Sequence, residues 1–368
     1  MRRSARTVAT FLPFSAPRNM SPVPRPMNAS QPNLADLGWK SFYSNQLSAE
    51  EARLYRPGRV MAVHRGMVEV LGEALEGAIS SVISESRGPE DRPTVGDWLL
   101  IEPSGKRVVR ILDRTSLFKR PAPGESRRLQ LIAANVDTLF IVTSCNQDFN
   151  VGRIERYLVL AREVGVQPVI VLTKADLADE PDRFIAAALA LTPEVEMING
   201  RDPTSVARLL ERCRCGETVA LVGSSGVGKS TLINTLRGSD SIATQAVREA
   251  DGKGRHTTTV REMHRLDQGA LGGGWLVDTP GMRELQLSDA AAGVTEVFAD
   301  IAAMTLECRF TNCTHAAEPD CAVQAAIANG SLGRGRLDRW RKLTAEEVAN
   351  TAKLAPRRPR ADKPNKRN

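Results

Sequence analysis

Short apolar or alternating segments fill the chain from residue 59 to residue 112. They lie at residues 59–63, 67–71, 77–82, 96–101 and 108–112, and turn signals such as Arg65-Gly66 and Ser104-Gly105 separate them. Several short strands at this spacing are typical of an all-β barrel. The pattern therefore predicts a small barrel, which can bind RNA or serve only for packing, since both kinds share the pattern.

From residue 134 to residue 282 the pattern changes to strands that alternate with helices. Apolar strands are predicted at residues 169–172, 218–222 and 275–278, and a helix at residues 229–236. This alternation is typical of a parallel sheet with helices on its faces. Further on, an apolar stripe at helical spacing predicts a helix packed into a core. The stripe consists of Val294, Val297, Phe298, Ile301 and Met304.

The net charge of +7 is unevenly spread over the 368 residues, a length sufficient for two or three domains. Residues 1–30 contain five arginines and no acid, and residues 353–368 contain seven basic residues and one acid, so the part between them is slightly acidic. Attraction to phosphate must then come from the two ends and from local groups. The candidate local groups could also be an ordinary solvated run of charge. They are Lys106, Arg107, Arg110, Arg114, Lys119, Arg120, Arg127 and Arg128.

A phosphate-binding loop is predicted between the strand at 218–222 and the helix at 229–236. The loop reads Gly223-Ser224-Ser225-Gly226-Val227-Gly228-Lys229-Ser230. Its glycines let backbone N–H groups approach phosphates, and the helix N-terminus favours an anion. We expect Lys229 to reach the β- and γ-phosphates and the Ser230 hydroxyl to bind Mg²⁺. A plain glycine-rich turn is the alternative.

Two further motifs follow predicted strands. Asp278-Thr279-Pro280-Gly281 is by itself a common turn, but at this distance beyond Lys229 the carboxylate can hold hydrated Mg²⁺ and the Gly281 N–H can meet a γ-phosphate. Thr173-Lys174-Ala175-Asp176 can recognise a base, because its aspartate can accept two hydrogen bonds from guanine, whereas adenine has no matching donor pair. Alone this tetrapeptide could be a helix start; together the motifs predict GTP rather than ATP.

The order of these motifs is unusual. The base motif precedes the phosphate loop, whereas ordinary small GTPases have the phosphate loop first. This rotation predicts a circularly permuted GTPase domain, because joining the ends of a compact domain and cutting it elsewhere can preserve its fold.

Between the phosphate loop and Asp278 lies a basic stretch that predicts a switch loop, residues 252–259. We expect Thr258 to close on Mg²⁺, with Thr259 next, although Thr259 also fits a strand start. Met282 occupies the position where small GTPases often have a glutamine that orients the attacking water. The chain alone is then expected to hydrolyse GTP slowly, unless His256 orients the water; a solvated or RNA-contacting histidine is the alternative.

A second group predicts a metal site. Cys308, Cys313, His315 and Cys321 lie within fourteen residues and match the donor set of a structural zinc ion. With four protein ligands no coordination position stays open, so we assign the ion no chemistry. Disulfides are the alternative, but a GTPase implies a reducing cytosol.

Taken together, the motif order, the Gly-Arg-His-Thr-Thr-Thr switch and the Cys-x4-Cys-x-His-x5-Cys cluster resemble the ribosome small-subunit-dependent GTPase A family. The resemblance runs from about residue 58 to about residue 343 and includes residues 131–138 and 146–150. It implies a multidomain fold with an N-terminal all-β OB barrel, a central α/β permuted GTPase domain and a mostly helical C-terminal zinc-binding domain. It also implies action late in the assembly of the small ribosomal subunit.

At matching positions the resemblance implies roles for individual residues. The catalytic group is Lys229, His256 and Thr258, and Mg²⁺ is held by Ser230, Thr258 and Asp278. Residues expected to contact GTP or GDP are Thr173, Lys174, Asp176, Gly223, Ser224, Ser225, Gly226, Val227, Gly228, Lys229, Ser230, Thr231, Asp278 and Gly281. Two departures are Thr173, where many GTPases have asparagine, and Asn199-Gly200, where a Ser-Ala pair is expected beside the base.

The predicted domains are a flexible extension at 1–54, the barrel at 55–116, the GTPase domain at 117–285, the zinc domain at 286–352 and a basic disordered tail at 353–368. We expect a cytoplasmic monomer that binds the small subunit and its rRNA and no membrane, since residues 1–30 lack a long apolar run. Their composition also fits an organellar transit peptide, and translation could begin at Met20 or Met27. Alternative functions are an RNA-binding assembly chaperone and a permuted GTPase of the large subunit.

Overall fold

The structure is a computed structural model. It describes residues 33–64, 66–73, 75–80, 89–121, 129–238, 261–266, 273–278, 282, 285 and 287–354.

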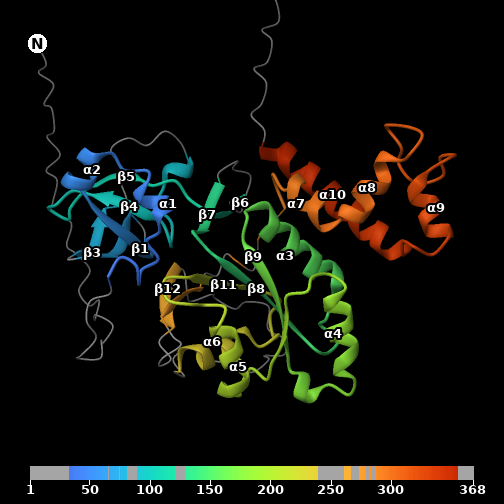
Figure 1. The fold of residues 1–368 in the computed structure, drawn as a ribbon, viewed down its shortest axis with the longest axis horizontal. Coiled ribbons are helices and arrows are strands. Elements are labelled where there is room, and N and C mark those ends of the chain that lie inside the picture. The colour runs from blue at the N-terminus through green and yellow to red at the C-terminus, as the bar shows by residue number, and fades with distance from the viewer. Residues whose placement is uncertain are drawn as a thin grey trace, which may run out of the picture. The chain divides into compact units, whose positions relative to one another are not determined.

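Five antiparallel strands form the barrel-like part (Figure 1). The long strand β1 (Arg56–His64) pairs with both β2 (Met67–Gly72) and β4 (Trp98–Ile101), while β2 pairs with β3 (Leu75–Ser80) and β4 with β5 (Val108–Ile111). The five predicted strands are all present, with ends that differ by a few residues. Their inward side chains make a separate small core that includes Val60, Val68, Val70, Leu99 and Ile101.

The central sheet has its parallel strands in the order β10-β9-β8-β11-β13. These are β8 (Thr138–Ser144), β9 (Gln167–Thr173), β10 (Val195–Met197), β11 (Thr218–Val222) and β13 (Gly274–Asp278). Strand β12 (Arg261–Leu266) is antiparallel to β13, and two of its residues also pair with β1. The barrel and the central sheet are therefore joined by backbone hydrogen bonds.

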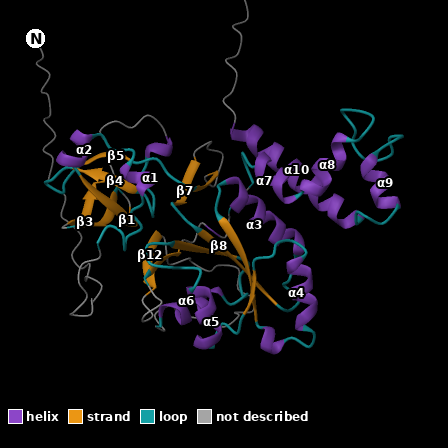
Figure 2. Cartoon of the chain, viewed as in Figure 1, coloured by secondary structure: helices purple, strands orange, loops and turns teal. Residues whose placement is uncertain are grey.

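Helices cover both faces of this sheet (Figure 2). They are α3 (Val151–Glu163), α4 (Pro181–Leu189), α5 (Pro203–Leu210) and α6 (Lys229–Arg237). Successive strand residues enter different cores, because side chains alternate across a strand. Ile141 and Leu172 pack with Leu158 of α3, whereas Phe140 and Val171 belong to a second cluster. Burial on both faces explains the continuous apolar strands in the sequence.

Short elements connect these parts, and helices follow the sheet. The connecting elements are the hairpin β6 (Leu117–Pro121) with β7 (Leu129–Ala134), and the 3₁₀ turns η1 (Pro89–Asp91) and η2 (Ala175–Leu177). The C-terminal helices are α7 (Ala291–Val297), α8 (Ala299–Leu306), α9 (Ala322–Ala328) and α10 (Arg334–Leu354). The predicted apolar stripe is confirmed as core, since Val294, Phe298 and Ile301 are buried. No described helix is long and apolar enough to cross a membrane.

Helix α3 is the element on which the C-terminal helices pack. Gly293 of α7 lies so close to α3 that a Cβ there would come within 2.3 Å of the Val159 carbonyl oxygen. The Glu155 carboxylate, which is completely buried, pairs with Arg336 at 3.2 Å and with Arg339 at 2.6 Å. A buried carboxylate is stable only when cations satisfy it, so these pairs fix α10 against α3.

The structure differs from the expected flexible extension at 1–54. From residue 33 the chain is ordered and forms α1 (Ser41–Ser44) and α2 (Ala49–Leu54). Leu37 and Tyr43 are buried, and the rings of Trp39 and Tyr43 pack against Trp98 of β4. Burial of these large apolar side chains offsets the entropy lost when the segment is ordered.

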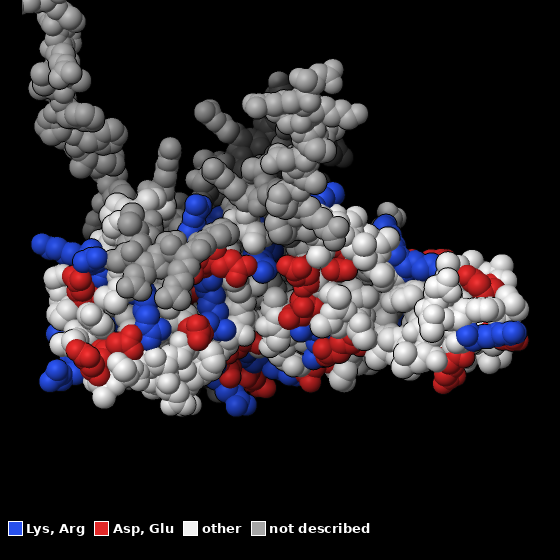
Figure 3. Space-filling model, turned by 90° about the horizontal axis from the view of Figure 1, so that it is seen from above, with Lys and Arg blue, Asp and Glu red and all other residues white. Residues whose placement is uncertain are grey.

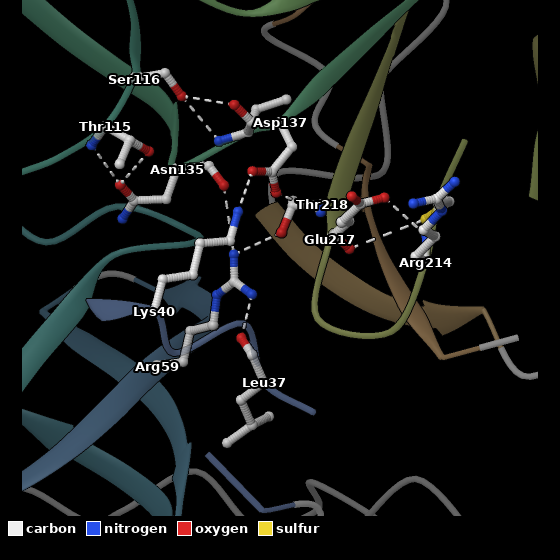
Figure 4. Close-up of polar contacts among 12 residues, drawn as sticks. Leu37, Lys40, Arg59, Thr115, Ser116, Asn135, Asp137, Arg214, Glu217 and Thr218 are labelled. Atoms are coloured by element: carbon white, nitrogen blue, oxygen red, sulfur yellow. Dashed lines mark hydrogen bonds and ion pairs between the residues drawn. The ribbon is translucent and has the colours of Figure 1, made fainter. Parts of the chain in front are cut away.

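A buried arginine joins this segment to the two sheets (Figure 4). The Arg59 side chain, on a residue only 2 % exposed, donates to the Leu37 carbonyl, to the Thr218 hydroxyl at 2.6 Å and to the Asn135 carbonyl at 3.5 Å. Nearby, Asp137 accepts from Lys40 at 2.5 Å and from the Thr218 N–H at 2.8 Å. Burial lowers the pKa of Arg59 to about 10, but this pKa is still well above neutral pH, so the guanidinium stays charged.

We predict that Arg59→Met lowers the free energy of unfolding by about 3 kcal/mol, since it leaves several buried acceptors without their donor. Urea denaturation followed by circular dichroism measures this change. Arg56→Met is the matched control, because Arg56 lies on the same strand and is exposed. An equal loss of stability in both variants would contradict the role of the buried guanidinium.

Candidate functional site

The three predicted nucleotide motifs follow strands of one parallel sheet. β9 ends at Thr173, β11 ends at Val222, and β13 ends at Asp278. Because parallel strands end at the same edge, the base motif, the phosphate loop and the Asp278 carboxylate all lie at the carboxyl edge of the sheet. The rotated order along the chain does not separate them, since strand pairing and not chain order decides which strands are neighbours.

The glycines of the phosphate loop are required by its backbone. Gly223, Gly226 and Gly228 have φ angles of 144°, 81° and 97°, in the region that favours glycine. A Cβ on Gly223 would also lie 2.2 Å from the carbonyl oxygen of Val142 at the end of β8. Gly223, which follows β11, therefore lies directly against the backbone of the neighbouring strand β8.

Lys229 begins α6 and turns back over the loop. Its side-chain amine donates to the Gly223 carbonyl at 2.7 Å and to the Ser224 carbonyl. The N-cap of α6 is Gly228, which has no side-chain oxygen to accept from the first N–H groups, so these donors are available to an anion. Ser230 and Thr231 follow in the same first turn, both half-buried.

The base motif is fastened directly to the phosphate loop. The Thr173 hydroxyl lies 2.6 Å from the Val227 carbonyl oxygen and 3.2 Å from that of Thr143, and the shorter contact is the hydrogen bond it donates. The Lys174 amine donates to the Gly226 carbonyl at 2.8 Å. The threonine that stands in place of the usual asparagine thus still links the two motifs. Asp176, in η2, is exposed.

The loop that contains Asn199 and Gly200 follows β10, which is the neighbour of β9. The Thr235 hydroxyl of α6 donates to the Gly200 carbonyl at 2.7 Å, and the Asn199 side-chain oxygen accepts from the Arg201 N–H at 3.0 Å. The departure from a Ser-Ala pair is therefore accommodated by a loop that is held through its backbone.

The residues predicted for catalysis are only partly described. Lys229 and Ser230 lie in the loop and helix above, and Asp278 is half-buried at the end of β13. Met282 is 1 % exposed and packs in the main core, so its thioether is not available to orient a water molecule. His256, Thr258, Thr259 and Gly281 lie outside the described residues.

One contact at this edge has no signal in the sequence. Arg153, in the first turn of α3, donates from Nη1 to the hydroxyl of Ser224 in the phosphate loop. An exposed arginine on an amphipathic helix is ordinarily a solvated group, and the pattern of residues 151–163 does not distinguish it. Only the arrangement of α3 beside the loop reveals the contact.

The predicted metal ligands come together. The Cys308 Sγ lies 3.5 Å from His315 Nδ1 and 3.9 Å from Cys321 Sγ, and Cys321 Sγ lies 3.5 Å from the same nitrogen. With Cys313, all four ligand atoms lie within 4.8 Å of one another. A tetrahedral zinc ion would separate two sulfurs by about 3.8 Å and a sulfur from a nitrogen by about 3.5 Å. The cluster is compatible with such an ion.

Neighbouring helices hold the cluster in place. The His315 carbonyl accepts from Gln324 of α9 and from Arg341 of α10, the latter at 2.7 Å, and Arg341 also donates to the Thr314 carbonyl. These contacts fix His315 in its left-handed conformation, with a φ of 57°. The sequence spacing predicted the ligands but gave no signal for these supporting residues.

Four of the eight basic residues predicted between barrel and sheet pair with acids. Arg107 pairs with Glu102 at 3.6 Å and Arg110 with Glu51 at 2.8 Å. Arg114 pairs with Asp97 at 2.7 Å, and Lys119 with Glu90 at 2.8 Å. On the face drawn in Figure 3, Lys and Arg side chains are interspersed with Asp and Glu. Formal charge counting does not reveal this pairing, because three of the four acids, Glu51, Glu90 and Asp97, come from positions far from their partners in the chain.

Comparisons with known proteins agree with this geometry. The model of the family described as RsgA GTPase matches residues 111–288. A protein of Mesorhizobium japonicum named "Small ribosomal subunit biogenesis GTPase RsgA" is 48 % identical over 335 residues, which cover 90 % of this chain and 94 % of that protein. The chain belongs to the RsgA GTPase family. It is therefore a GTPase.

Other relatives give the same result. A Xanthomonas axonopodis pv. citri protein of the same name is 42 % identical and covers 89 % of this chain and 92 % of its own. The crystal structure of YjeQ from Thermotoga maritima has a TM-score of 0.57 and 25 % identity, and the match covers 80 % of this chain and 99 % of that one. The structure of YloQ, titled "a circularly permuted GTPase", has a TM-score of 0.53 and 23 % identity over 83 % of this chain and 97 % of that one. The fold of these two structures supports the predicted combination of barrel, permuted central sheet and C-terminal helices.

Proposed function

We propose that this chain binds GTP at the carboxyl edge of its central sheet and hydrolyses it during late maturation of the small ribosomal subunit. The observation that carries the proposal is the direct link between the base motif and the phosphate loop through Thr173 and Lys174. One nucleotide can bridge two motifs only if they are held at a fixed separation. The names of the relatives, which say "small ribosomal subunit biogenesis", support the subunit as partner.

The base and the phosphates have separate sites in this proposal. Asp176 accepts hydrogen bonds from guanine, and Lys174 lies along the ring, while Thr173 keeps this motif against the loop. The loop N–H groups from Gly223 to Thr231 surround the phosphates, and the Lys229 amine leaves the loop carbonyls for the β- and γ-phosphates. Gly281 contributes an N–H to the γ-phosphate.

Hydroxyl and carboxylate oxygens are the donors that Mg²⁺ prefers, and Ser230 and Asp278 supply them at this edge, with Thr258 from the switch loop. When bound, Mg²⁺ neutralises charge on the phosphates. Hydrolysis by this chain depends mainly on positioning of GTP and water, because Met282 is buried where a water-orienting glutamine is usual. We propose a low intrinsic rate that the subunit stimulates, with His256 beside the switch threonines as the residue that orients water.

We propose that the cluster of Cys308, Cys313, His315 and Cys321 binds one structural zinc ion. The distances between ligand atoms fit a tetrahedral ion with no open position. His315 faces the sulfurs through Nδ1, and its ring contacts Trp340 of α10 with 5.7 Å between centroids. The ion would therefore connect the end of α8, the loop and the start of α9, and so stabilise the C-terminal helices.

For the partner, we propose that the basic ends and the barrel contact rRNA of the small subunit, and that the chain acts as a cytoplasmic monomer. Because acids pair with local basic residues between barrel and sheet, we assign more of the attraction to rRNA phosphates to the basic ends of the chain. The second candidate is an RNA-binding chaperone whose affinity for RNA is controlled by the nucleotide. The burial of Met282 at the position where a water-orienting glutamine is usual favours it.

We predict that purified small subunits raise the rate of GTP hydrolysis by at least about tenfold, whereas large subunits leave it nearly unchanged. Phosphate release at saturating GTP measures both rates, and Lys229→Ala, which lacks the amine for the β- and γ-phosphates, should show no stimulated rate. Stimulation by large subunits alone would contradict the proposed partner. Nucleotide-controlled binding to small subunits without stimulation would support the chaperone instead.

We also predict that chelation exposes the cluster to thiol reagents. Burial raises the pKa of Cys145 to about 11 and that of Cys213 to about 12. Partial burial and the neighbouring Asp36 raise the pKa of Cys215 as well, but this thiol is exposed, so in the zinc-bound protein it is the cysteine that a thiol reagent reaches first. After removal of zinc, Cys308, Cys313 and Cys321 should react as well. Mass spectrometry of the alkylated protein identifies the residues, and equal reactivity before and after chelation would count against the zinc site.

A further inference from the structure

Arg153 brings a cation from α3 to the phosphate loop. The start of α3 is fixed by Asn150, whose side chain accepts from the Arg153 N–H at 2.9 Å. The Arg153 side chain donates from Nη1 to the Ser224 hydroxyl and lies 3.4 Å from the Asp148 carbonyl oxygen. A small pocket between helix and loop is lined by Thr143, Asn150, Arg153, Tyr157 and Ser224.

The position along the loop indicates which phosphate this cation meets. Ser224 accepts hydrogen bonds from two cations, from Arg153 at its hydroxyl and from Lys229 at its carbonyl. The lysine of a phosphate loop reaches the β- and γ-phosphates. Because Arg153 and Lys229 both donate to Ser224, the guanidinium lies beside the lysine amine. Arg153 therefore lies near the terminal phosphates of the triphosphate and not near the base.

The Arg153 charge is also available to a ligand. Elsewhere on α3, Arg156 pairs with Glu346 and Arg162 with Glu296. Within the described part of the chain Arg153 makes no ion pair, and its two acceptors are a hydroxyl and a carbonyl. A phosphate oxygen forms a stronger, charge-assisted hydrogen bond with a guanidinium than a neutral hydroxyl does.

We propose that Arg153 binds the γ-phosphate of GTP and so makes the site prefer GTP over GDP. This inference rests on the proposed function of the same site. On binding of GTP, the Arg153 side chain exchanges the Ser224 hydroxyl for a phosphate oxygen. Helix α3 stays in place, because Glu155, two residues after Arg153, is paired with Arg336 and Arg339 of α10. An arginine supplied by the same chain stabilises the charge that develops on the transferred phosphoryl group.

The test compares Arg153→Ala and Arg153→Lys with wild type and with Arg183→Ala. Arg183 is a matched control, because it lies on the surface of α4, where it contacts nearby Glu180 and the ring of Phe184. Affinities for fluorescent GDP and for a fluorescent non-hydrolysable GTP analogue are measured together with the single-turnover rate of GTP hydrolysis. Thermal unfolding of each variant reports on folding.

We expect Arg153→Ala to bind the GTP analogue about 10- to 100-fold more weakly, with GDP affinity close to wild type, and to lose hydrolysis rate. Arg153→Lys should lose less, since it keeps the charge but not the two-pronged geometry, and Arg183→Ala should match wild type. Equal weakening of GTP and GDP would overturn the proposal, because it would show that Arg153 only supports the loop. Unchanged GTP affinity would overturn it as well. If wild type itself bound no GTP, the proposed function would fail first.

Discussion

The hydrogen bond from Thr173 to the Val227 carbonyl joins the base motif to the phosphate loop at the carboxyl edge of the central sheet. The two residues are 54 positions apart, and β8 lies between their strands in the sheet. Because β8 lies between β9 and β11, the loop reaches Thr173 across the end of β8, and Gly223 lets the start of the loop lie against the β8 backbone because it has no side chain. Base motif and phosphate loop are thereby held as one rigid edge, although the chain supplies them in the rotated order.

The parts that flank the central sheet contact elements that begin or end at this edge. β12 lies between β13, which ends at Asp278, and β1 of the barrel. α3 begins beside the phosphate loop at Arg153 and carries α7 and α10 on its surface. The buried Arg59 adds a further junction between the N-terminal segment, β1 and β11. A single element therefore separates each flanking part from the proposed nucleotide-binding edge of the sheet: β12 in the case of the barrel and α3 in the case of the C-terminal helices.

The sequence predicted the parts of this site that are encoded locally. The glycine spacing of the loop, the strands that end at Thr173, Val222 and Asp278, and the four clustered metal ligands each follow from a short stretch of chain. Partners brought together from distant positions were not predictable in this way. Residues 33–54 are ordered because they pack against Trp98, which lies far along the chain. Arg110 and Arg114 are paired with acids that no local pattern connects to them. The same reason explains why Arg153 was missed.

We propose that the rotated motifs build one guanine-specific site, and substitution of Asp176 tests this specificity most directly. In Asp176→Asn an amide replaces the carboxylate that we propose accepts from guanine, and the amide N–H can donate to the carbonyl that xanthine has in place of the guanine amine. Competition binding should show that the variant loses affinity for GTP by at least about tenfold and gains affinity for xanthosine triphosphate. Unchanged preference for GTP in this variant would contradict the account, because guanine would then be recognised elsewhere.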